Sequence, residues 1–289
     1  MSSLSGHHTI TQRAIRELST AYACHPIAGT IDPKSIPWQV IMRDIRDVVN
    51  LGHWSNFGQK HHFMRYKGQA QVEAYNEAVS WIKANATQGA KLLARQLRIH
   101  YKHSQPFREI SNPLRRPTPL YCDGSERKRR LMESGGDAWA GVAIIHRIGN
   151  YKIKRGAVSW HSIGNALHAL QDSFSASHVK RSTQSPERPG QILSIEVYDE
   201  ENKKTHNHHD DGWEGQREDE LSLRGRLAVH ACKALLAVII NTAIKQRGGN
   251  VDTLRGWASF KNTWLALSPQ FGTTSSTHSP DHSHSHGHY

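Results

Sequence analysis

The sequence predicts a single all-α domain of several helices joined by long loops. Apolar residues recur at spacings of three and four in several long segments, as in helices with one buried face. Only one short run, residues 192–199, is rich enough in β-branched residues to suggest a strand. A length of 289 residues is enough to bury a substantial core. We therefore expect one helical domain over residues 1–270.

The expected helices follow one another along the chain. The first should begin at a Thr-x-x-Gln capping box formed by Thr9 and Gln12. Further helices are expected at residues 38–49, 68–100, 137–149, 159–173, 218–246 and 251–266. Residues 182–191, with two prolines and a glycine, should form a loop. The His-rich, low-complexity tail over residues 271–289 is predicted to be disordered.

The net charge and the targeting signals of the sequence limit which partners and which cellular compartment we expect. The formal net charge is +12, which favours polyanionic partners such as nucleic acid or anionic lipid, although a basic enzyme without such a partner has the same composition. The most apolar segment, residues 227–244, contains His230 and Lys233, which argues against a transmembrane helix. No signal peptide is evident. We therefore expect synthesis in the cytoplasm, with any export using a specialised secretion system.

Histidine is the outlier of the composition, with 21 residues, of which five lie in the tail. In the stretch "ALHALQDSFSASH", His168 and Asp172 are four residues apart and would share one face of a helix. His178 follows after the expected helix end. Two imidazoles and a carboxylate suit zinc and related divalent ions, but a buried helix with incidental histidines would show the same pattern.

Further clusters make a metal site the better interpretation. His7 and His8 stand just before the expected first helix, and Asp47 precedes a loop that ends in His61 and His62. The segment "THNHHDDGW" adds three histidines and two aspartates. Each cluster alone is weak evidence, because histidine-rich loops are often merely solvated. Four of them in one helical domain predict a shared site.

These motifs resemble those of the zinc-dependent phospholipase C and S1/P1 nuclease superfamily. The signature Leu-His-x3-Asp-x5-His corresponds to Leu167, His168, Asp172 and His178. The order of the remaining motifs also agrees, and the matching residues are His7, Asp47, His62, His206 and Asp210. The resemblance implies a helical fold around three zinc ions and the hydrolysis of phosphodiesters, as in bacterial phospholipase C-like members without a signal peptide.

The resemblance also implies a ligand set. Asp47, His62 and His168 would hold one ion, and Asp172 would bridge it to a second ion that also binds His7. His178, His206 and Asp210 would hold a third. Asp47 would orient or deprotonate the attacking water, because clustered divalent ions lower the pKa of a bound water.

Three ligand positions stay open at this stage. The family uses a free N-terminal amine as a ligand, and here Ser2, exposed by removal of the initiator methionine, or His8 would take that place. His61 is the neighbour of His62, and His209 or Asp211 offers an alternative register within "HNHHDD".

Three functional hypotheses follow. The first is a phospholipase C-like enzyme that acts at a membrane surface and serves as a secreted effector or toxin. The second is a nuclease for single-stranded DNA or RNA, which the charge of +12 and the spacing around His7, Asp47 and His62 favour. The third is a metal-binding or nucleic-acid-binding protein without catalysis.

Overall fold

The computed structural model describes residues 2–21, 36–37, 39–41, 43, 55–100, 158–197, 221–246 and 251–272. The fold of these residues is mostly helical, as predicted, with one small hairpin. The helices are α1 (Ser2–Ala21), α3 (Gln71–His100), α6 (Val158–Asp172), α8 (Leu223–Lys245) and α9 (Trp257–Trp264). A short 3-10 helix, η3, covers Gln59–His62, and the strands are β1 (Val179–Arg181) and β2 (Ile192–Ile195).

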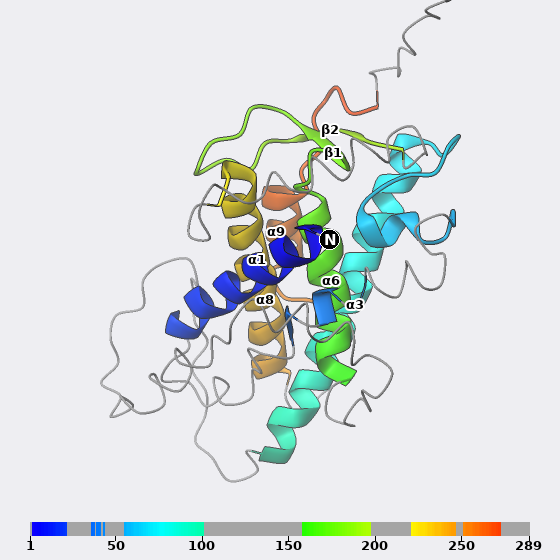
Figure 1. The fold of residues 1–289 in the computed structure, drawn as a ribbon. Coiled ribbons are helices and arrows are strands. Elements are labelled where there is room, and N and C mark those ends of the chain that lie inside the picture. The colour runs from blue at the N-terminus through cyan, green and yellow to red at the C-terminus, as the bar shows by residue number, and fades with distance from the viewer. Residues whose placement is uncertain are drawn as a thin grey trace, which may run out of the picture.

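Helix α6 is the centre of the fold. Figure 1 shows it between α3 and α8, with α1 crossing near its C-terminal end. Every residue from 162 to 175 is buried. A helix covered on all sides must satisfy its polar side chains inside the protein, because water cannot reach them. The polar residues of α6 therefore have to be explained by their protein neighbours or by a bound ligand.

Small residues let the neighbouring chain segments approach α6 closely. A Cβ atom at Gly89 of α3 would lie 2.5 Å from Cγ1 of Ile163. A Cβ atom at Gly164 of α6 would lie 2.6 Å from the backbone carbonyl carbon of Gln39. Both distances are too short for any larger residue, so these glycines set how near the adjacent segments come to α6.

Helix α8 is the most apolar of the helices. It begins at Leu223, later than the predicted residue 218, because the side chain of Ser222 accepts a hydrogen bond from the backbone N–H of Gly225 and caps it. Length and composition alone would let α8 cross a membrane, but 72% of its most apolar window is buried inside the protein. It packs against α1, α3 and α6 as a core helix.

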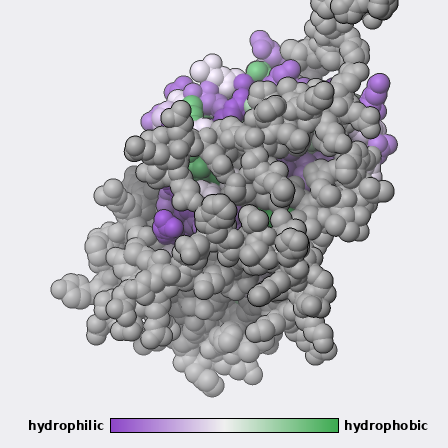
Figure 2. Space-filling model, in the orientation of Figure 1, coloured by the Kyte–Doolittle hydropathy of each residue, from purple (hydrophilic) through white to green (hydrophobic). Residues whose placement is uncertain are grey.

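The hairpin follows directly on the end of α6. Strands β1 and β2 are antiparallel, with Val179 opposite Ile195, and the predicted loop 182–191 joins them. The predicted strand at residues 192–199 is thus confirmed in its first half. Figure 2 shows the described surface around this hairpin as mostly hydrophilic, in agreement with the exposed side chains of Lys180, Glu187 and Arg188.

Two further predicted helix starts are wrong. Helix α1 begins at Ser2 and not after Thr9, so His7 lies inside the helix. The buried face of α1 extends back to His7, which lies at helical spacing from Ile10, Thr11 and Ala14, and this packing overrides the local capping signal. Helix α9 begins at Trp257 and not at residue 251, because Gly256 takes a left-handed conformation with φ of 80°.

Some predictions fall outside the described residues. They concern the helix at residues 137–149, most of the helix at 38–49 and the tail beyond residue 272.

Candidate metal centre

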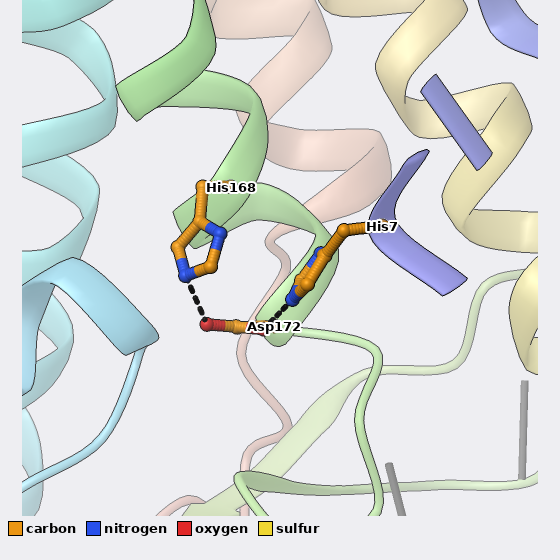
Figure 3. Close-up of side chains that lie close together, drawn as sticks. All are labelled: His7, His168 and Asp172. Atoms are coloured by element: carbon orange, nitrogen blue, oxygen red, sulfur yellow. Dashed lines mark ion pairs between the residues drawn. The ribbon is translucent and has the colours of Figure 1, made fainter. Parts of the chain in front are cut away.

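Asp172, the last residue of α6, lies at the centre of a buried group of histidines. Its side chain is about 3% exposed. His168, one turn earlier on the same helix, places Nε2 3.1 Å from Oδ2 of Asp172. The prediction that the two side chains share one helix face is thus confirmed, and both point into the same buried space (Figure 3).

His7 reaches the same carboxylate from α1. Its Nε2 lies 3.2 Å from the other oxygen of Asp172, Oδ1, and its ring centre is 4.4 Å from that of His168. Figure 3 shows the carboxylate between the two rings. Nitrogen atoms of His7 and His168 and an oxygen of Asp172 lie within 4.8 Å of one another, so this buried group could bind a metal ion. The two oxygens of Asp172 face different histidines, as a bridging carboxylate would.

His62 completes a triangle of ligand atoms on the other side of the carboxylate. It ends η3, and the next residue, Phe63, turns the chain in a left-handed conformation with φ of 51°. This conformation is costly for a residue other than glycine. The turn leaves Nδ1 of His62 3.1 Å from Oδ2 of Asp172 and 3.0 Å from Nε2 of His168.

His178 joins the group from the turn between α6 and β1, as predicted. Its Nδ1 lies 2.6 Å from the backbone oxygen of His62 and 3.8 Å from Oδ2 of Asp172. A carbonyl oxygen can only accept a hydrogen bond, so Nδ1 of His178 must carry the proton. The shared bond also ties the positions of His62 and His178 together.

The carboxylate of Asp172 is held in its charged form. Burial raises the pKa of this group, but the nearby rings of His168, His178 and His7 outweigh burial and hold the pKa well below its usual range. The charge therefore persists at neutral pH in a place that water does not reach.

Protons cannot satisfy the triangle of His62, His168 and Asp172. An ionised carboxylate only accepts, and each ring nitrogen carries either one proton or one lone pair. At most two of the three contacts can then be hydrogen bonds. A cation that receives all three lone pairs would satisfy the whole triangle. Adjacent ligand atoms in a tetrahedral zinc site are about 3.3 Å apart, close to the 3.0–3.1 Å observed here.

The other predicted site residues are distributed differently. His61 is buried next to His62 but packs toward α3, with its ring centre 4.3 Å from that of Trp81. His8 is half-buried, and burial lowers its pKa. Ser2 is the first residue of α1. Asp47, His206, His209, Asp210 and Asp211 lie outside the described residues, so their place in the site stays a prediction.

One residue of the site was not predicted. Gln171 is fully buried, and its Oε1 lies 2.6 Å from Nδ1 of His7. The available signal was its position, three residues after His168 and directly before Asp172, which places it near the same end of α6.

Comparison with protein-family models, with curated proteins and with solved structures found no match to this chain. The function of this protein therefore has to be inferred from the site itself.

Proposed function

We propose that this protein is a metal-dependent phosphodiester hydrolase of the phospholipase C type. The observation that carries the proposal is the meeting of four histidines, from α1, η3, α6 and the turn after α6, around one buried carboxylate. These are His7, His62, His168 and His178 around Asp172. A merely structural role would not require so many potential metal ligands at one ionised group.

The donor set indicates how ions would be held. His62, His168 and Asp172 would bind one ion, and His7 would bind a second that shares Asp172. His178 would serve a third, together with His206 and Asp210. Neutral imidazoles with carboxylates are typical zinc ligands, so we propose zinc over calcium or magnesium, which prefer oxygen.

Such ions, when bound, polarise the phosphoryl group, lower the pKa of a coordinated water and neutralise the leaving oxygen. The protein's own residues provide the fixed positions. Because the described ligand side chains are nearly inaccessible to water, their geometry is set by packing before any ion binds. Asp47, from its place in the family resemblance, is the proposed group that orients or deprotonates the attacking water.

The substrate class divides the proposal in two. The closeness of "ALHALQDSFSASH" to phospholipase C-like members supports a phospholipid as the substrate, with diacylglycerol as the leaving group and the phosphorylated headgroup as the second product. The net charge of +12 supports a second candidate, a nuclease for single-stranded nucleic acid, because a basic surface attracts polyphosphates.

One assay tests both candidates. The zinc-loaded protein is incubated with vesicles of phosphatidylcholine or phosphatidylethanolamine and, separately, with single-stranded DNA and RNA. Release of phosphorylated headgroup with intact nucleic acid supports the phospholipase, and the reverse result supports the nuclease. Asp172→Asn, which keeps the shape but removes the charge, is the matched control and should be inactive on either substrate. A zinc-loaded protein that cleaves neither would support binding without catalysis and overturn the proposal.

A further inference from the structure

We propose that Gln171, held in place by Thr11, is a positioning residue that fixes the tautomer of His7 and directs its Nε2 toward a metal ion. This inference deepens the proposed function and rests on metal binding at Asp172. It concerns residues of α1 and α6 that are not themselves ligands.

Three buried residues form a closed ring of hydrogen bonds. The hydroxyl Oγ1 of Thr11 lies 2.8 Å from the backbone oxygen of His7, one turn earlier on α1. The same oxygen atom lies 2.7 Å from Nε2 of Gln171, and Oε1 of Gln171 lies 2.6 Å from Nδ1 of His7. Thr11 and Gln171 are fully buried and His7 is 3% exposed, so water does not compete for these contacts.

The ring has one arrangement of hydrogens that satisfies every contact. The hydroxyl of Thr11 has a single hydrogen, which it donates to the carbonyl of His7. Toward Gln171 it can then only accept, so the amide NH2 must face Thr11. If the amide were rotated by half a turn, one hydroxyl hydrogen would have to serve two carbonyl oxygens. The amide oxygen of Gln171 therefore faces His7.

This arrangement determines the state of the His7 ring. Since Nδ1 faces an oxygen that only accepts, Nδ1 must carry the proton, and in the neutral ring Nε2 carries a lone pair. That lone pair lies 3.2 Å from Oδ1 of Asp172, which also carries lone pairs. Two facing acceptors repel each other in a buried site unless a cation lies with them, which is either a second proton on His7 or the metal ion on which this inference rests. Gln171 thus prepares an ion position that His7 and Asp172 share.

The geometry also links this ion to the docking of α1. His7 and Thr11 belong to α1, whereas Gln171 and Asp172 are adjacent on α6. The ligand pair and its positioning pair therefore form between the same two helices, and disturbing either should weaken the ion held there.

Three variants test the inference. Gln171→Met keeps the length of the side chain but removes the acceptor, and Thr11→Val keeps the shape but removes the lock on the amide. Gln171→Glu retains an oxygen facing Nδ1. The matched control is Asn165→Leu, which removes a buried amide of α6 that donates to Oδ1 of Asn85 on α3, away from His7.

The measurements are zinc affinity, by competition with a chelator, and the His7 tautomer, by ¹⁵N NMR of the zinc-loaded protein. We expect Gln171→Met to weaken the weakest-bound zinc by about 10–100-fold, as for other residues that orient metal-bound histidines. Thr11→Val and Gln171→Glu, which keep an acceptor facing Nδ1 but lose the contact between Thr11 and the amide NH2, should weaken it less, whereas Asn165→Leu should stay close to the wild type. The NMR spectrum should show His7 protonated at Nδ1.

The outcomes separate this inference from the proposed function. Unchanged zinc affinity in both Gln171→Met and Thr11→Val, or a His7 ring protonated at Nε2, would overturn the positioning role alone. A wild-type protein that binds no zinc, with His7 protonated at both nitrogens, would overturn the metal site and with it this inference. If Gln171→Met does not fold, Thr11→Val and the tautomer of the wild type decide the question.

Discussion

Two buried charges, Asp172 at the end of α6 and Arg181 in the strand that follows it, have surroundings that differ in kind. Arg181, in β1, donates hydrogen bonds to the backbone oxygens of Ser173, Gly190 and Trp264 and to the hydroxyl of Ser173, at 2.9–3.1 Å. Its guanidinium lies 4.2 Å from the ring centre of Phe174. These partners are neutral acceptors supplied by the protein itself, as expected for a buried charge with a structural role.

Asp172 is also buried, but hydrogen bonds cannot satisfy all of its contacts with its neighbours. The nitrogens around it lie at 3.1–3.8 Å, and the triangle with His62 and His168 has more contacts than protons can satisfy. Burial lowers the pKa of Arg181 to about 9, with the positive charge of Arg224 adding to the effect, so this group also remains charged at neutral pH. Both groups are charged at neutral pH, but of the two only Asp172 has neighbours that could bind a cation together with it.

This difference distinguishes a charge with a structural role from one that could bind a metal ion. A buried charge whose hydrogen bonds are all made to the protein serves the fold, and here Arg181 ties β1 to the loop before β2 and to the end of α9. A buried charge whose partners are themselves potential metal ligands could instead bind a metal ion, as the group of His7, His168 and Asp172 could.

Metal removal should have the largest effect. Each ion present at about 1,000 times its Kd stabilises the folded protein by about 4 kcal/mol. We therefore expect excess chelator to lower the Tm of the wild type by roughly 2–4 °C for each kcal/mol lost. Asp172→Asn should lose bound zinc, and its Tm should not respond to chelator. Differential scanning calorimetry and metal analysis measure both quantities.

Two results would contradict a metal site at Asp172. One is a wild-type Tm that does not respond to chelator. The other is an Asp172→Asn protein that retains the zinc content of the wild type.

Arg181→Met should lower the stability of the protein without a loss of zinc, unlike Asp172→Asn. The change leaves three carbonyl groups without this donor, at about 1 kcal/mol or more each, so we expect a loss of roughly 3 kcal/mol in the free energy of unfolding. Zinc content per folded protein should stay that of the wild type, because the guanidinium faces carbonyl oxygens and not the histidines. Urea unfolding and metal analysis test this pair of expectations. A large loss of zinc would show that the two charges are not independent.

The local part of the site was predictable from the sequence. The spacing of His168, Asp172 and His178 is set by one helix and the turn that ends it, so the pattern determines the geometry. His7 and His62 were identified by their order along the chain, and the structure brings both to Asp172. The start of α1 was mispredicted because a capping box is a local signal, and the burial of His7 against α6 outweighs it.

The sequence does not show whether the protein itself satisfies the hydrogen bonding of each buried charge. The acceptors of Arg181 come from residues 173, 190 and 264, and the partner of Gln171 on α1 is 160 residues away. Neither contact leaves a periodic pattern. Polar residues in a buried helix look alike in sequence, and only the distant segments that meet them decide which are satisfied.

Gly164→Ala should act on stability alone, as Arg181→Met does. The added Cβ would meet the backbone of Gln39 at 2.6 Å, which costs about 1–3 kcal/mol, and alanine returns up to about 1 kcal/mol as the better helix former. We expect a net loss of roughly 1–2 kcal/mol in chemical unfolding. Zinc affinity should not change, since Asp172 lies two turns further along α6. A loss of zinc comparable to that in Asp172→Asn would show that the cluster depends on packing at a distance.

Glu17, which is paired with Lys233, is a charge of a third kind because it is partly exposed to water. The ammonium of Lys233 on α8 lies 2.7 Å from Oε2 of Glu17 on α1, whose side chain is 33% exposed. Burial raises the pKa of Glu17, but the hydrogen bond and charge of Lys233 outweigh burial and lower the pKa overall. Because water screens the pair, Glu17→Gln should cost less than about 1 kcal/mol at neutral pH.

The pH dependence of this cost has a definite sign. A pKa lowered by folding contributes stability that is complete above the usual glutamate value of about 4.3 and is lost as the pH falls through the lowered value. The difference between wild type and Glu17→Gln in urea unfolding should therefore be constant from neutral pH to about 5, shrink below about 4.3 and decrease in high salt. A difference that grows toward acidic pH, or that salt does not reduce, would mean that Glu17 acts through packing. Like Arg181, Glu17 would then stabilise the protein through fixed contacts in its interior and not through a charge that water screens.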